Sequence, residues 1–212
     1  RYLLSCHINC KYFPIHNLSH YSLLQSTTKL DKLVSKAVKN EYKAVGLTDF
    51  TSISGAVSFI KECGSKIRPI LGCEVLFSDH PQELPPTLTL VCKNLKDWKK
   101  LLKIVSESND KENYKGNPSL SLGRFAELDL TDFVVLDGYL GSLLSEQLFV
   151  QYRESYLATD YNELAETCLD RDWKLNAEKH ISAMVARFGS DYFIELPIFE
   201  SDTFPAKTLL KN

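Results

Sequence analysis

YFPIHNLSHYSLLQ, residues 12–25, is the stretch on which the interpretation of this chain depends. Side chains along a strand alternate between its two faces with a period of two. In a strand through this segment, positions 16 and 18 would therefore share a face. His16 offers an imidazole there, whereas Leu18 has no lone pair to donate to a metal ion.

The composition is that of a globular protein. The 212 residues are 44% apolar and 25% charged, which is enough chain for one large domain or two small ones. The formal net charge is −2, whereas a free-standing nucleic-acid-binding domain usually carries a basic bias. One cluster of lysines has the spacing of a helix face and is interpreted as a solvated surface: Lys93, Lys96, Lys99, Lys100 and Lys103.

The cysteines and the absence of long apolar runs indicate a cytosolic protein. Without an apolar signal segment, reduced thiols are expected at all six positions. Cys6-His7-x-x-Cys10 begins like a zinc motif, but a second Cys/His pair does not follow at the usual spacing. Residues 1–11 are therefore expected to form an N-terminal extension. The sequence has no run near the roughly 18 apolar residues that a membrane helix needs.

Hydrophobic periodicity predicts an alternation of helices and strands. The predicted helices span 30–41, 54–64, 95–105, 142–157 and 161–188, and the predicted strands span 44–49, 67–75, 87–92, 133–136 and 192–196. The polar, turn-rich segment 106–120 is expected to be a loop. This alternation predicts an α/β domain with a largely parallel sheet.

Three side chains at or near the ends of predicted strands form a candidate metal site: His16, Asp49 and Glu74. An imidazole with carboxylates suits a divalent transition metal, and such an ion can activate water for phosphoester hydrolysis. Acids at strand ends favour a barrel with its site on the C-terminal rim. They are also common in α/β folds without a metal, so spacing alone leaves a structural role open.

Several segments resemble the PHP (polymerase and histidinol phosphatase) family, most closely the PHP domains of bacterial DNA polymerase III alpha subunits. Residues 12–25 resemble its His-x-His opening, and 33–78, with AVGLTDF and IRPILGCE, resemble its second block. VVLDGYLGSLL resembles the family's Ser-Gly-Cys-Leu-x-Gly segment. The resemblance implies a distorted TIM-like (β/α)7 barrel of the PHP type over 12–212, lacking its last strands.

The resemblance also implies a set of metal ligands, which this chain keeps only in part. His16, Asp49 and Glu74 match ligand positions of the family. The family has histidine at two further positions and cysteine at a third, where this chain has Leu18, Phe50 and Tyr139. Because ligand number and geometry set metal affinity, we expect a vestigial site without catalytic residues. It would hold no tightly bound cofactor, or at most one zinc or manganese ion.

The resemblance favours a non-catalytic PHP module of a cytoplasmic replicative DNA polymerase, whose parent chain would be a DNA-directed DNA polymerase. The implied partners are the rest of the polymerase and replisome subunits such as a proofreading exonuclease, with only indirect contact to DNA and none to a membrane. Two alternatives remain open. The first is a metal-dependent phosphoesterase or 3′–5′ exonuclease with a reduced site. The second is a stand-alone PHP-fold interaction protein.

Overall fold

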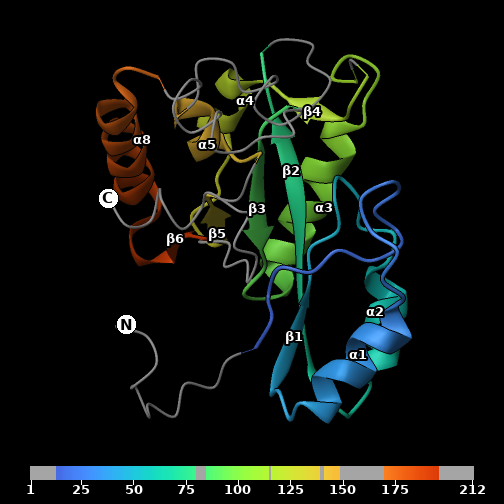
Figure 1. Ribbon diagram of the computed structural model, residues 1–212. Helices are drawn as coiled ribbons and strands as arrows, with labels where there is room; N and C mark the ends of the chain where they lie inside the picture. The colour runs from blue at the N-terminus through green and yellow to red at the C-terminus, as the bar shows by residue number, and fades with distance from the viewer. Residues whose placement is uncertain (1–12, 80–84, 115, 139–140, 149–169, 196–212) are drawn as a thin grey trace, which may run out of the picture. The chain divides into compact units, whose positions relative to one another are not determined.

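A computed structural model describes residues 13–79, 85–114, 116–138, 141–148 and 170–195 of the chain (Figure 1). The chain divides into two compact units, Arg1–Cys73 and Glu74–Asn212. The predicted N-terminal extension, residues 1–11, lies outside the described residues.

The first unit combines two helices with a pair of parallel strands. Its elements are α1 (Leu30–Lys39), β1 (Ala44–Leu47), α2 (Ala56–Cys63) and the first part of β2 (Arg68–Phe77). Residues 44–47 pair in parallel with 68–71. The spacing of Leu30, Val34 and Ala37 places them on one face of α1, and this face is buried in a core with Val45 and Phe59.

The second unit contains the remaining elements. They are β3 (Thr87–Val91), α3 (Leu95–Ser108), β4 (Ser119–Leu120), α4 (Leu122–Glu127), β5 (Val134–Asp137), α5 (Leu143–Leu148), α8 (Trp173–Phe188), a 3-10 turn η1 (Gly189–Asp191) and β6 (Tyr192–Ile194). Figure 1 shows α8 leading through this turn into β6. The large side chains that are fully buried in this unit include Phe77, Leu88, Leu101 and Phe133.

The strands follow the order β1-β2-β3-β5-β6, with β4 beside β2, and form an open sheet over the described residues. The pairs β1–β2, β2–β4 and β5–β6 are parallel, but β3 and β5 are antiparallel. These pairs are thus largely parallel, as predicted, with β3–β5 as the antiparallel exception. Because α3, β4 and α4 separate β3 from β5, their link is not the single-helix crossover that makes neighbouring strands parallel.

Two predicted boundaries need correction. The expected loop at 106–120 is partly structured, because α3 continues to Ser108 and β4 begins at Ser119. Polar side chains also bond to the end of α3: Ser108 Oγ and Asn109 Nδ2 both donate to the carbonyl of Val105. The helix predicted over 161–188 is interrupted, because residues 171 and 172 form a turn and α8 begins only at Trp173; residues 149–169 lie outside the described part of the chain.

A bilayer-spanning helix is not found in the described part of the chain, where every helix is too short or too polar for that role.

Candidate functional site

Asp49 is the centre of a buried hydrogen-bond network in the first unit. It follows β1 by two residues, and only 1% of its surface is exposed. Its Oδ1 accepts hydrogen bonds from the Ser19 amide at 2.6 Å and from the Ser22 hydroxyl at 2.7 Å. Its Oδ2 accepts one from the Ser19 hydroxyl at 2.9 Å. The Asp49 carboxylate, which was predicted from the sequence to be a metal ligand, thus accepts hydrogen bonds from three protein donors.

The donors Ser19 and Ser22 belong to a tight loop formed by residues 19–26. The amide of Ser22 donates to the carbonyl of Ser19, and those of Gln25 and Ser26 donate to the carbonyl of Ser22. The Ser22 hydroxyl also accepts the amide of Phe50 at 2.9 Å. Ser19 and Ser22 are both buried. The hydrogen bonds that hold this loop against the end of β1 are therefore shielded from water.

The segment that carries His16 runs beside β1. The Gly46 amide donates to the carbonyl of Pro14 at 2.8 Å, and the Thr48 amide donates to that of Asn17 at 2.9 Å. A Cβ atom on Gly46 would lie 1.8 Å from the carbonyl oxygen of Ile15, so only glycine permits this approach. His16 is half-buried in this segment.

The structure describes all three predicted ligand positions, His16, Asp49 and Glu74. Glu74 is 7% exposed and belongs to the second unit, whereas His16 and Asp49 belong to the first. Nowhere in the described ranges do three or more His, Cys, Asp or Glu side chains gather in an arrangement that could hold a metal ion. Phe50 is half-buried, and Tyr139 lies outside the described residues.

A second buried carboxylate, Asp137, ends β5 in the second unit. Its Oδ2 lies 2.8 Å from His180 Nε2 and accepts the Tyr192 hydroxyl at 2.9 Å. Its Oδ1 accepts the amides of Gly138 and Leu144 at 2.8 and 3.0 Å. This network was not predicted from the sequence. The available signal was VVLD at 134–137, which is an apolar strand closed by an acid like the one before Asp49.

Burial acts on the two acidic groups of this network with different results. Burial favours the neutral form of Asp137, but the hydrogen bond from His180 and the Leu144 amide outweigh it and leave the pKa of this carboxyl below its usual value. Burial, followed by the Asp137 charge, raises the pKa of the Tyr192 hydroxyl. Asp137 is therefore an anion and Tyr192 a hydrogen-bond donor at neutral pH.

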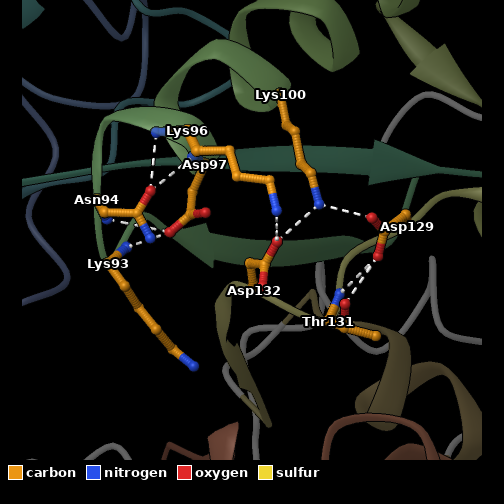
Figure 2. Close-up of polar contacts among 8 residues, drawn as sticks. All are labelled: Lys93, Asn94, Lys96, Asp97, Lys100, Asp129, Thr131 and Asp132. Atoms are coloured by element: carbon orange, nitrogen blue, oxygen red, sulfur yellow. Dashed lines mark hydrogen bonds and ion pairs between the residues drawn. The ribbon is translucent and has the colours of Figure 1, made fainter.

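Two lysines on α3, Lys96 and Lys100, are paired with acidic side chains. Figure 2 shows Lys96 and Lys100 converging on Asp132, at 3.1 and 2.9 Å, while Lys100 also reaches Asp129 at 2.6 Å. Figure 2 also shows the reciprocal bonds between Asn94 and Asp97 that cap α3. Lys96 remains 72% exposed, in agreement with the predicted solvated face, but acidic partners cancel much of the positive charge.

The comparison with known proteins places this chain in a family. The family model described as the PHP domain matches residues 14–197. The chain belongs to the PHP domain family. In this PHP chain, Asp49 and its serine partners, as well as Asp137 and its partners, all fall inside the matched region.

The PHP chain is similar to the DNA polymerase III subunit alpha of several bacteria. It is 32% identical to that of Chlamydia trachomatis over 105 residues, which cover 45% of this chain and 8% of the relative. The similarity to the Bacillus subtilis protein is 32% over 141 residues, covering 66% and 13% of the two chains. With the Aquifex aeolicus protein it is 26% over 197 residues, covering 86% and 15%. The PHP chain thus spans a small part of the length of each relative.

Proposed function

We propose that this chain is a non-catalytic PHP module that serves a replicative DNA polymerase as structural support and as a docking surface for partner proteins. The observation that carries the proposal is the bonding of Asp49. Two donors occupy Oδ1, which equals the number of its lone pairs, and a third donor occupies Oδ2. A carboxylate that accepts these three hydrogen bonds holds the loop in place, and it has little capacity left to bind a metal ion.

Two other positions, where the resemblance implies metal ligands, also support a non-catalytic module. Leu18 and Phe50 have no lone pair to offer at two positions where the resemblance implies histidine. A multinuclear metal centre therefore does not fit these residues. We expect no tightly bound metal, or at most a single zinc or manganese ion at the remaining set His16, Asp49 and Glu74.

The setting of the module is part of the proposal. Similarity to DNA polymerase III alpha subunits supports a place in the cytoplasm within a replicative polymerase, beside its core and subunits such as a proofreading exonuclease. The ion pairs of Lys96 and Lys100 argue against direct binding of DNA phosphates by α3. The match to the PHP family supports a distorted TIM-like (β/α)7 barrel as the architecture of this domain.

Hydrolysis assays test the non-catalytic claim. We expect the full chain to hydrolyse a phosphodiester probe such as bis(p-nitrophenyl) phosphate at the background rate, with or without added manganese, because the proposed module would hold no clustered metal to lower the pKa of a water. The matched control is His16→Ala, which should behave identically. Manganese-dependent hydrolysis that disappears in His16→Ala would establish the phosphoesterase or exonuclease alternative instead.

Co-purification tests the docking claim separately. The full chain is mixed with the purified replicative exonuclease subunit and the polymerase subunit of its own organism, and complexes are sought by size-exclusion chromatography. Co-elution with either subunit is the expected result. Elution as a separate species from both, together with background hydrolysis, would favour the stand-alone interaction protein.

A further inference from the structure

Asp137 joins parts of the second unit that are far apart in the sequence. One oxygen of its carboxylate accepts the amides of the adjacent Gly138 and of Leu144 in α5, and the other binds His180 of α8 and Tyr192 of β6. The sequence separations to His180 and Tyr192 are 43 and 55 residues. The Asp137 side chain has no exposed surface and that of His180 has 15%. Four donors on one buried carboxylate satisfy it without help from water.

Helix α8, which carries His180, packs against the rest of the unit through one narrow face. His180, Met184, Arg187 and Phe188 have the spacing of one stripe of a helix. Within α8 the buried side chains are Met184 and Phe188, so apolar burial holds this 16-residue helix weakly for its length. The polar contacts of the stripe are His180 with Asp137, and Arg187 with the carbonyls of Phe125 and Leu128, both at 2.7 Å.

The strand that carries Tyr192 is equally dependent on a few contacts. β6 has three residues, of which Phe193 and Ile194 are 51% and 38% exposed. It pairs with β5 through the register of Tyr192 with Val135 and Ile194 with Asp137. Tyr192 is the buried side chain of β6, and its hydroxyl donates a hydrogen bond to Asp137. Removing Asp137 would thus leave a buried hydroxyl and a largely buried imidazole without their acceptor.

We propose that Asp137 is a latch, a single carboxylate that holds α8 and β6 in place on β5, so that its loss releases both elements in one step. The released body would be residues 173–194, which open together while α3 and β3 stay folded. Elements that open as one cooperative unit show the same opening equilibrium at all their amides. The latch does not depend on Asp49, which belongs to the other unit.

Hydrogen exchange measured by mass spectrometry on the full chain tests the latch. In Asp137→Ala, the amides of α8 and β6 should exchange faster by a common factor of about ten or more. The loss of one hydrogen bond to a charged group shifts an opening equilibrium by roughly that factor. The amides of α3 should not change. The matched control is Asp132→Asn, which removes an acid of the exposed α3 pairs and should leave α8 and β6 as in the wild type.

Single-partner variants separate a shared latch from two unrelated contacts. His180→Gln and Tyr192→Phe should each speed exchange in both α8 and β6. If His180→Gln affects α8 alone and Tyr192→Phe affects β6 alone, the latch is refuted. Should Asp137→Ala fail to fold, the wild type still decides the question. Equal opening free energies in α8 and β6, with equal denaturant dependence, are expected, and different ones would overturn the proposal.

Discussion

The hydroxyl of Ser22 donates a hydrogen bond of 2.7 Å to Oδ1 of Asp49 and accepts one of 2.9 Å from the amide of Phe50. One buried hydroxyl therefore satisfies both a carboxylate and a backbone donor at the end of β1. The PHP fold commonly suggests metal chemistry at such an acid. In this chain the acid closes a loop, and the consequences can be measured.

Ser22→Ala should destabilise the first unit. The variant removes a donor to a buried carboxylate and leaves the Phe50 amide without its acceptor, which together cost about 2–4 kcal/mol. We expect the β1 amides to lose protection from hydrogen exchange accordingly. Ser35→Ala, on the exposed side of α1, is the control and should change stability by less than about 0.5 kcal/mol. Equal effects of the two substitutions would contradict the structural role of Asp49.

Gly46→Ala should be among the most damaging small substitutions in the chain. The new Cβ would overlap the carbonyl oxygen of Ile15, and the backbone there is fixed by the Gly46–Pro14 bond. Overpacking of this kind costs about 1–3 kcal/mol or more. Gly123→Ala is the control, because its Cβ would meet only Ser121 Oγ at 3.8 Å within a helix. There we expect a gain of about 0.4–1 kcal/mol, and thermal unfolding compares the two.

The stability of the second unit should depend on the charge of Asp137. Its pKa is lowered in the folded state, so its contribution is present above the unfolded value of about 3.9 and is lost as the pH falls through the folded pKa. Both tryptophans of the chain, Trp98 and Trp173, lie in this unit, so their fluorescence reports its unfolding by urea. The stability difference between wild type and Asp137→Asn should shrink as the pH falls below about 4. A difference that stays the same or grows below that pH would contradict this assignment.

Two cysteines should be unreactive in the folded chain. Burial, and then the nearby Asp97 charge, raises the pKa of Cys92 to about 12. Burial also raises the pKa of Cys63 to about 11, with the neighbouring Lys66 acting in the opposite sense. Because the thiolate is the reactive form, iodoacetamide at mildly basic pH should label neither residue until guanidinium chloride unfolds the chain. Rapid labelling of Cys92 in the native protein, seen by peptide mapping, would show that its surroundings are open.

Local signals in the sequence were sufficient for most elements and for the position of Asp49. The apolar run before Asp49 predicted a buried strand, and all of β1 is buried. The periodicity of residues 30–41 predicted α1, since that helix buries one regular face. Such patterns are set within a few residues, and periodicity records them directly.

Partners across long separations could not be predicted in this way. Ser19 and Ser22 lie 30 and 27 residues before Asp49, and nothing in the local pattern distinguishes them from exposed loop serines. His180 was recognised as part of a helix, but its pairing with Asp137 depends on how α8 packs. The antiparallel pairing of β3 with β5 likewise depends on the path of the intervening chain rather than on the strands themselves.

Elemental analysis of the purified full chain after dialysis tests the central claim most directly. If hydroxyls have taken the place of a metal at Asp49, and Leu18 and Phe50 supply no ligand, the chain should carry less than one tightly bound zinc or manganese ion per molecule. Two or three ions per chain, retained on dialysis and lost in His16→Ala, would contradict the account. That result would make the acids of this PHP domain metal ligands after all.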